Sequence, residues 1–253
     1  MSLFPRSKGL ARAHGHFTRR AWARSCGGKT VGELQMEKDI LNAQSQHWKN
    51  TYSKNKEMFG RNASEPAQYA AALFHERKMH GLLELGAGQG RDTLFFANHG
   101  FRVYALDYAD TGVDELQRLA EVSGISQSMI AVKHDIRQPL PFPDGSFDAC
   151  YAHMLFCMAL TTVELHHLSN EIHRILKPNG ICVYTVRHKG DAHYKVGTHR
   201  GEDMYEMGGF IVHFFNKEKV YELASGFDIL NVAEFEEGVL PRKLFRVTLE
   251  KQG

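Results

Sequence analysis

The sequence has little that would place the protein in a membrane or in an oxidising compartment. It holds four cysteines among 253 residues, and none of them forms a C-x-x-C pair. Three of them, Cys150, Cys157 and Cys182, stand in apolar stretches, which indicates buried and reduced thiols. No apolar run approaches the roughly 20 residues that a membrane span requires, and no charged-then-apolar signal peptide opens the sequence. We therefore expect a cytoplasmic protein that does not insert into a membrane.

Acidic residues are absent from the first 32 positions, which contain seven of the 31 lysines and arginines. The rest of the chain holds 24 basic and all 29 acidic residues, and this mild acidic excess argues against nucleic acid as the main partner. We predict a basic, disordered arm over residues 1–35 and one folded domain over residues 36–253. Two other interpretations of the arm stay open: a transit-like peptide, or sequence that precedes a start at Met36.

Helical and strand patterns alternate from residue 36 onward. Residues 36–80 predict two helices that cover the functional site, the first with Trp48, Tyr52 and Phe59 on one face and the second capped by Ser64. Short apolar strands are expected at residues 81–85, 102–107, 129–135, 147–153 and 181–187, with helices between them at residues 91–98, 110–122 and 163–176. We expect a turn at "KPNG", directly before the fifth strand. After the fifth strand we expect a long irregular loop at residues 188–209, a helix near residues 216–224, and strands at residues 227–237 and 243–251.

This order of elements predicts an α/β fold. Strands separated by single helices form parallel βαβ units, with helices on both faces of the sheet. The last two strands are joined by a link so short that they must pair antiparallel. We expect a Rossmann-like, seven-stranded, mostly parallel sheet that ends in an antiparallel strand pair.

The stretch "LLELGAGQGRDTLFFA", residues 82–97, places a glycine-rich turn between the first strand and the next helix. Backbone N–H groups at such a turn bind polar ligands. The spacing G-x-G-x-G differs from the dinucleotide fingerprint G-x-G-x-x-G, because Arg91 stands where the third glycine would fall. A phosphate-binding P-loop would need a lysine that this turn lacks. Both phosphate-binding interpretations are therefore disfavoured.

Acidic side chains stand at the ends of the first three predicted strands. Glu84 lies near the end of the first strand, Asp107 ends the second, and Asp135 ends the third. A carboxylate at the second position accepts hydrogen bonds from a ribose diol, and one at the third can accept them from an adenine amino group. Three acids around one crevice suit a cationic adenosine ligand better than a pyrophosphate. S-adenosylmethionine, which carries a sulfonium and an ammonium group, is such a ligand.

From about Trp48 to the C-terminus, the chain resembles the class I S-adenosylmethionine-dependent methyltransferases. The glycine-rich stretch is similar to their motif I, "VYALDYA" to motif II, "KHDIRQPLPFPDGSFDACYAHMLF" to the next two motifs, and "EIHRILKPNGICVYTVR" to the segment after them. The closing strand pair is similar to the reversed hairpin of the family. Within the family, "GQGRDTLFFA" and the early "W…Y……FG" resemble the small-molecule branch that includes tellurite-resistance and thiopurine methyltransferases.

The resemblance implies roles for particular residues. The cofactor-binding residues that it implies are Glu84, Gly86, Ala87, Gly88, Asp107, Tyr108, Asp135 and Ile136. The first four, together with Gly90, would line the methionine end of the cofactor, Asp107 would bind the ribose, and the last three would surround the adenine. His153, after the fourth strand, would border both cofactor and acceptor.

Methyl transfer from a sulfonium is an in-line displacement that needs no metal, and it needs a general base only if the acceptor loses a proton. The polar segment after the fifth strand lies where an acceptor would be covered. We predict catalytic or acceptor-binding roles for His153, His193 and Arg200, and we expect no metal site. Further candidates for contact with the acceptor are Arg187, Tyr194, His199 and Tyr205. No "NPPY"-like motif follows the fourth strand, which disfavours DNA bases and favours a small-molecule acceptor.

Two other classes of function stay open at this point. One is a protein that binds S-adenosylmethionine for regulation or assembly without catalysis. The other is an NAD-dependent dehydrogenase, which the glycine spacing disfavours. The sequence does not determine the acceptor or the oligomeric state.

Overall fold

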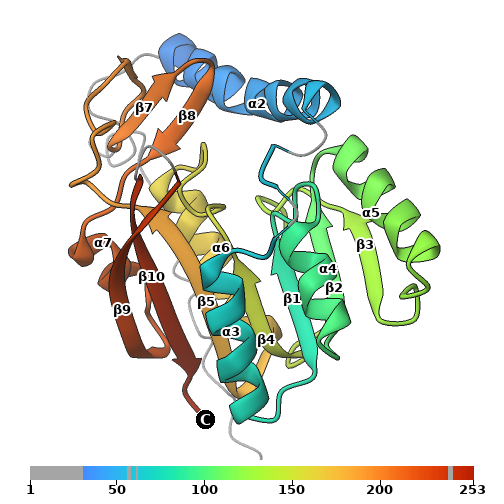
Figure 1. Ribbon diagram of the computed structural model, residues 1–253. Helices are drawn as coiled ribbons and strands as arrows, with labels where there is room; N and C mark the ends of the chain where they lie inside the picture. Colours follow the sequence, from blue (N-terminus) through green and yellow to red (C-terminus); the bar gives the residue numbers. More distant parts are fainter. Residues whose placement is uncertain (1–30, 56–57, 61, 239–241) are drawn as a thin grey trace, which may run out of the picture. The chain divides into compact units, whose positions relative to one another are not determined.

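The structure is a computed structural model, and it describes residues 31–55, 58–60, 62–238 and 242–253. Most of the predicted basic arm lies outside the described residues, and helix α2 (Val31–Lys54) includes its last five positions. The chain divides into two units, Met1–Asp39 and Ile40–Gly253. The second unit contains the remainder of α2 and every element that follows it (Figure 1).

A seven-stranded sheet forms the centre of the second unit, with the strand order β3-β2-β1-β4-β5-β10-β9. Its strands are β1 (Gly81–Leu85), β2 (Arg102–Asp107), β3 (Met129–Lys133), β4 (Phe147–Ala152), β5 (Leu176–Arg187), β9 (Phe227–Glu237) and β10 (Arg242–Lys251). The first five are parallel to one another, and β10 is antiparallel to both of its neighbours, β5 and β9. The sheet predicted from the sequence is confirmed.

Helices cover both faces of this sheet. The helices of one face are α3 (Glu65–Glu76), α4 (Arg91–Asn98) and α5 (Asp110–Val122), and those of the other face are α6 (Thr162–Ile175) and α7 (Lys217–Leu223). Successive strand residues point to opposite faces, so Leu82 joins the first group and Leu83 the second, both fully buried. Because both faces of the parallel strands are buried, the sequences of these strands are nearly continuous apolar runs.

Side chains cap the first backbone N–H groups of α3, α6 and α7, whereas α4 and α5 have no side-chain cap. The Ser64 hydroxyl accepts a hydrogen bond from the backbone N–H of Ala67 at 3.2 Å, as the sequence predicted for α3. Thr161 and Glu164 form a reciprocal capping box at the start of α6. These local signals set the first residues of α3 and α6.

The prediction of a long irregular loop at residues 188–209 is wrong for its second half. Three short strands, β6 (Thr198–His199), β7 (Met204–Met207) and β8 (Phe210–His213), form a small antiparallel sheet there. Gly208 and Gly209 connect β7 to β8 with φ angles of 57° and 86°. Two consecutive residues with positive φ are the requirement of a tight two-residue hairpin, which glycine meets without strain. The "GG" pair between apolar runs was the sequence signal for this hairpin.

The predicted turn at "KPNG" is part of an irregular strand start instead. β5 begins at Leu176, and its pairing with β4 shifts register between Phe147 and Ala149. Asn179 adopts a φ of 61° within this stretch. The chain therefore bends without leaving the sheet.

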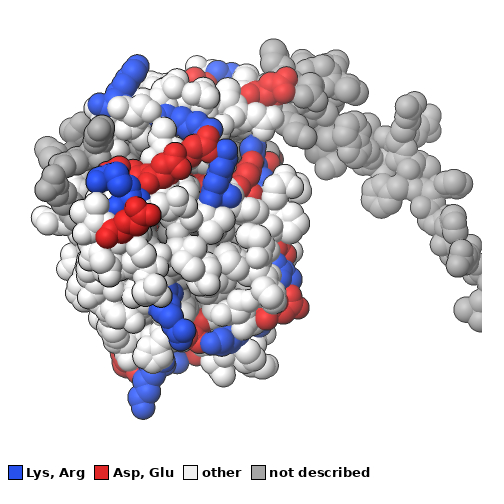
Figure 2. Space-filling view, turned by 90° about the vertical axis from the view of Figure 1, so that its right-hand side faces the viewer, with Lys and Arg blue, Asp and Glu red and all other residues white. Residues whose placement is uncertain are grey.

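Charged side chains of both signs stand side by side on the face of the molecule next to α5 and β3 (Figure 2). On these elements, Asp110 forms ion pairs with both Lys49 and Lys133. Nucleic-acid-binding proteins instead present clustered basic residues, and the described residues of this face do not. Among the described residues, none of the helices is long and apolar enough to cross a bilayer.

Candidate active site

The carboxyl ends of β1, β2 and β3 form the floor of a crevice. β1 lies between β2 and β4, so the chain connections on its two sides run in opposite directions across the sheet. In open α/β sheets, ligands bind at such a reversal point, beyond the carboxyl ends of the strands. Glu84 lies one residue before the end of β1, and Asp107 is the last residue of β2. Asp135, predicted to end the third strand, lies two residues beyond the end of β3.

The glycine-rich loop is tied to the end of β2 through backbone hydrogen bonds. The N–H groups of Gly86 and Ala87 donate to the carbonyl oxygen of Leu106 at 2.8 and 3.1 Å. Gly86 and Gly88 have φ angles of 71° and 56°. A Cβ on Gly86 would also lie 2.9 Å from the Leu155 side chain. Both the backbone conformation and the close approach of Leu155 therefore require glycine at this position.

Asp107 joins the glycine loop to the start of α5. One carboxylate oxygen accepts from the N–H of Gly88 and the other from the N–H of Ala109, each at 2.8 Å. The side chain is 5% exposed. Burial raises the pKa of Asp107, and these backbone N–H groups partly oppose the rise. Each oxygen keeps a further lone pair, with which it can accept from a ligand hydroxyl.

Glu84 presents a buried oxygen that has no hydrogen-bond partner. The residue is 3% exposed, and among the described residues none donates to its Oε2 atom. Burial, followed by the charge of Asp92, raises the pKa of Glu84 to about 8. A buried acceptor without a donor costs about 1–3 kcal/mol. A ligand ammonium group at this point would remove that cost, so the residue fits the methionine end of S-adenosylmethionine.

One pocket is lined by Tyr108, Asp135 and Ile136, the three residues that the resemblance assigns to the adenine. Its cavity volume is about 50 Å³, and it opens to solvent. Leu155, Met158 and Leu160 contribute apolar walls, and α2 contributes Leu41, Gln44, Ser45 and Trp48. Its mixture of apolar walls and one acid suits an adenine ring with its amino group.

Asp135 is held by a neighbour that the sequence predictions did not include. The Arg137 guanidinium donates to both carboxylate oxygens of Asp135 at 2.7–3.1 Å, and its third nitrogen donates to Asn42 of α2 at 2.7 Å. Burial alone would raise the pKa of Asp135, but the hydrogen bonds and charge of Arg137 outweigh it and lower the pKa. The acid at the adenine end is therefore ionised and connected to α2.

Helix α2 contributes aromatic side chains to the crevice. The Trp48 ring lies 5.4 Å from the ring of Tyr52, 6.5 Å from that of Phe59 and 4.6 Å from that of Phe210 in β8. The Gln44 side chain accepts from the Ile211 N–H at 3.1 Å and donates to the carbonyl oxygen of Gly209 at 3.0 Å. The helix is thus attached to the small sheet through both apolar and polar contacts.

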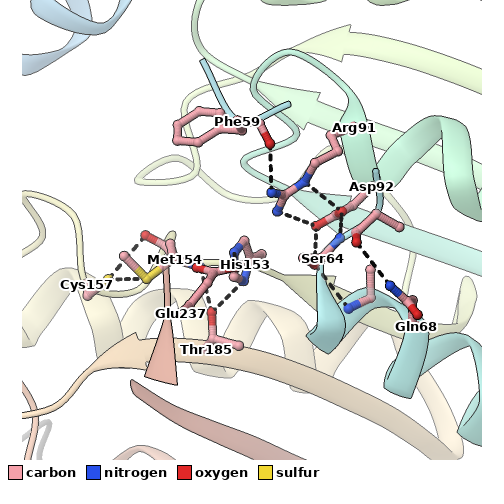
Figure 3. A network of polar contacts seen from close by, with 12 residues as sticks. Phe59, Ser64, Gln68, Arg91, Asp92, His153, Met154, Cys157, Thr185 and Glu237 are labelled. Carbon is pink, nitrogen blue, oxygen red and sulfur yellow. Dashed lines mark hydrogen bonds and ion pairs between the residues drawn. The ribbon is translucent and has the colours of Figure 1, made fainter. Parts of the chain in front are cut away.

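Asp92, an acid that the sequence predictions missed, lies in the first turn of α4 and accepts several hydrogen bonds (Figure 3). Its carboxylate accepts from the N–H and the hydroxyl of Ser64 at 2.8 and 2.7 Å, and from the Tyr151 hydroxyl at 3.2 Å. Arg91 donates to it at 3.1 Å and also to the carbonyl oxygen of Phe59 at 3.1 Å. Burial is outweighed by Arg91, His153 and Ser64, which lower the pKa of Asp92. This network joins α3, α4 and β4 beside the glycine loop.

His153 lies beside this network, where its ring contacts residues of two other strands (Figure 3). Its Nδ1 atom is 2.9 Å from the Thr185 hydroxyl of β5, and its Nε2 atom is 3.3 Å from Oε1 of Glu237 in β9. Burial would raise the pKa of Glu237, but the hydrogen bond and charge of His153 lower it. The predicted residue His153 therefore has an acidic partner that comes from the far end of the sequence.

His193 and Arg200 have contacts within their own part of the chain. The Nδ1 atom of His193 lies 3.0 Å from Arg187 and 3.7 Å from Asp191, and its side chain is 46% exposed. Arg200 forms an ion pair with Glu206 in the small sheet. Arg187 itself is buried and paired with Asp191 at 2.6 Å, so it holds the segment after β5 in place. Among the described residues, these contacts do not join His193 or Arg200 to the glycine loop or to the three strand-end acids.

The remaining acceptor candidates also make contacts within this segment. The Tyr194 hydroxyl donates to Asp203 at 2.7 Å, and the His199 ring packs 5.0 Å from that of Tyr205. Among the described residues there is no group of three or more histidines, cysteines or acids that could hold a metal ion.

The comparisons with known proteins agree with this geometry. Residues 83–184 match the family described as "Methyltransferase domain". This match runs from β1 to β5, and the seven-stranded sheet with its closing antiparallel strand pair has the Rossmann-like methyltransferase fold.

Among curated relatives, sterol 24-C-methyltransferase erg6 of Aspergillus fumigatus is 34% identical over 103 residues, which are 40% of this chain and 26% of that enzyme. Among solved structures, the 1,6-didemethyltoxoflavin-N1-methyltransferase of Burkholderia thailandensis, with bound 1,6-didemethyltoxoflavin and S-adenosylhomocysteine, is similar with a TM-score of 0.63 and 17% identity. That similarity covers 98% of this chain and 94% of that one. TehB from Haemophilus influenzae is similar with a TM-score of 0.59 and 15% identity, over 81% of this chain and 67% of that one. These structural likenesses show the shared fold.

Proposed function

We propose that the protein transfers the methyl group of S-adenosylmethionine to a small-molecule acceptor. The observation that carries this proposal is the buried Oε2 atom of Glu84, which lacks a donor beside a glycine loop whose N–H group is bound by Asp107. The ammonium group of the cofactor would bind Glu84, its ribose would donate to Asp107, and its adenine amino group would donate to Asp135. The cofactor, when bound, supplies a methyl group on a sulfonium.

The contribution of the chain to the transfer would be alignment and exclusion of water. Trp48 of α2 lines the pocket, and its ring contacts the rings of Tyr52 and Phe59. Their apolar surfaces would remove water from a reaction in which the positive charge of the sulfonium is lost. A crevice with these aromatic side chains suits a small acceptor with an apolar or planar body.

His153 and Glu237 would serve acceptors that lose a proton. The Met154 N–H donates to the Thr185 hydroxyl at 2.9 Å, so that hydroxyl can donate its own hydrogen to Nδ1 of His153. This tautomer leaves the proton of His153 on Nε2, facing Glu237. In this tautomer a carboxylate oxygen of Glu237 would accept the proton from an acceptor hydroxyl or N–H group, and His153 would hold that carboxylate in place through its Nε2–H. His193 and Arg200 stay candidates for acceptor binding because they follow the carboxyl end of β5.

The finer branch within the family is also a proposal. The motif "GQGRDTLFFA" and the fold shared with TehB support the small-molecule branch with tellurite-resistance and thiopurine methyltransferases. The sequence match to sterol 24-C-methyltransferases supports a small organic acceptor as well.

The proposed activity is tested with S-adenosylmethionine carrying a deuterated methyl group. The full chain is incubated with this cofactor and a small-molecule extract, and mass spectrometry follows both S-adenosylhomocysteine and new deuterium-labelled products. We expect both to form together, and neither with Asp107→Ala at the same concentration. Binding of the cofactor without labelled product in any extract would favour a protein that binds S-adenosylmethionine for regulation.

A further inference from the structure

The hydroxyl of Tyr52 is a polar group in the crevice that the described residues leave without a hydrogen bond. Tyr52 lies in the last turns of α2, and its ring packs against those of Trp48 and Phe59 at 5.4 and 6.5 Å. These two contacts fix the plane of the ring. The position of the hydroxyl is therefore set by the packing of α2 and not by a polar partner.

The hydroxyl points at the centre of the glycine loop. A Cβ placed on Gly88 would lie 3.1 Å from Oη of Tyr52 and 3.7 Å from its Cζ. Gly88 is also the residue whose N–H is bound by Asp107. Tyr52 thus covers the turn between the first strand and α4, at the point where the loop exposes its backbone to a ligand.

The two carboxylate oxygens of Asp107 accept from the N–H groups of Gly88 and Ala109, and neither is hydrogen-bonded to the Tyr52 hydroxyl. Burial, followed by the charges of Asp107 and Tyr108, raises the pKa of Tyr52 well above its usual value. The group is therefore a neutral O–H donor at every pH at which the protein would function. A donor in such a place binds an acceptor atom of the ligand.

Two polar groups beside the glycine loop have no hydrogen-bond partner among the described residues, and one is an acceptor while the other is a donor. Glu84 offers a buried acceptor oxygen, and Tyr52 offers a donor. Glu84 lies in β1 two residues before the first glycine of the loop, and the Tyr52 hydroxyl lies against Gly88 within the loop. An α-amino acid group carries one ammonium and one carboxylate, and it complements this pair of an acceptor and a donor.

We propose that Tyr52 is a cofactor-positioning residue whose hydroxyl donates to the carboxylate of the amino-acid end of S-adenosylmethionine. This inference rests on the proposed function, because it requires that the cofactor bind in the crevice. It adds that α2 supplies part of the cofactor site. Binding of the amino-acid end would then stabilise the contacts of α2 with Phe210 and Gly209 in the small sheet.

The test compares two ligands that differ only at the amino-acid end. S-adenosylhomocysteine has this end, and 5′-methylthioadenosine lacks it. Affinities of the full chain for both are measured by titration calorimetry for the wild type, Tyr52→Phe and Tyr69→Phe. Tyr69 is the matched control, because its hydroxyl lies 3.4 Å from that of Thr248 on the far strand pair.

We expect Tyr52→Phe to weaken S-adenosylhomocysteine binding by about 10- to 100-fold, the usual effect of losing a hydrogen bond to a charged group. Its affinity for 5′-methylthioadenosine should stay within about 2-fold of the wild type, since the ring and its packing are kept. Tyr69→Phe should change neither. The melting temperature of Tyr52→Phe without ligand should not fall, because the hydroxyl has no partner to lose.

Three outcomes would overturn the inference. Unchanged affinity of Tyr52→Phe for both ligands would mean that the residue only packs. Equal losses for both ligands would place the hydroxyl at the ribose. A wild type that binds neither ligand would refute the proposed function, and the inference with it.

Discussion

The backbone N–H of Gly88 donates to Oδ2 of Asp107 at 2.8 Å, so the glycine loop and the end of β2 are held as one unit. The other oxygen of Asp107 binds the N–H of Ala109 at the start of α5. A residue that was predicted to bind the ribose therefore also shapes the crevice. Its replacement should change both ligand binding and local stability.

Asp107→Ala should weaken S-adenosylhomocysteine binding by about 1.5–3 kcal/mol, because hydrogen bonds to a charged group are lost. The free energy of unfolding should also fall by about 1–3 kcal/mol, because two buried N–H groups lose their acceptor. Titration calorimetry and urea unfolding measure the two effects separately. Cofactor affinity equal to that of the wild type would show that Asp107 only supports the loop.

Glu84 should make the stability of the ligand-free protein fall as the pH rises. Its pKa is about 8 in the folded protein, against 4.5 when unperturbed. The folded state thus binds more protons than the unfolded state between these two values, and the free energy of unfolding decreases with pH across that window. Glu84→Gln should remove this slope and stabilise the ligand-free protein by up to about 3 kcal/mol at pH 7.

The same residue should give cofactor binding the opposite pH dependence. A ligand ammonium group favours ionised Glu84, so S-adenosylhomocysteine affinity should rise from pH 6 to pH 8 in the wild type. In Glu84→Gln, the affinity should be lower and nearly independent of pH over this range. A wild-type affinity that does not change with pH would contradict an ammonium contact at Glu84.

Asp92→Ala should destabilise the protein strongly, by about 3–5 kcal/mol, because it leaves Arg91 and the Ser64 groups without their partner in a buried site. Asp144→Ala is the matched control, since Asp144 also pairs with an arginine, Arg174, but its side chain is 83% exposed. This control should cost less than about 1 kcal/mol. Urea unfolding curves compare the two, and similar small losses would show that the Asp92 network is not structural.

His193→Ala and Arg200→Ala should leave S-adenosylhomocysteine affinity within about 2-fold of the wild type, because their contacts are with Arg187 and Glu206 and not with the glycine loop. Turnover on the true acceptor should fall if either side chain binds it. Loss of S-adenosylhomocysteine affinity would place this segment in the cofactor site. Unchanged turnover in both variants would leave His153 and Glu237 as the acceptor-binding groups.

The sequence predicts the parts of the site that depend on local spacing. The glycine loop, Asp107 and Asp135 are set by strand ends that can be read directly from apolar runs and glycine positions. The bounds of α4 and α5 agree with the prediction, because they too follow from local apolar and glycine patterns. The small sheet was missed because its short strands have weak patterns, although the glycine pair at residues 208–209 signalled a hairpin.

The parts that the sequence did not predict depend on contacts between distant segments. Glu237 reaches His153 from a strand that comes 84 positions later in the numbering, and Asp92 binds Ser64 in the cap of another helix. Tyr52 was placed on a helix face, but its approach to Gly88 follows from the way α2 packs on the crevice. No local pattern specifies such pairs, because tertiary packing decides which side chains meet.

The most direct test of the central claim is titration calorimetry of the wild-type chain with S-adenosylhomocysteine and, separately, with NAD. The arrangement of Glu84, Asp107 and Asp135 predicts saturable binding of S-adenosylhomocysteine at one site per chain, with a rise in melting temperature. It predicts no binding of NAD at the same concentration. Binding of NAD without binding of S-adenosylhomocysteine would contradict the account.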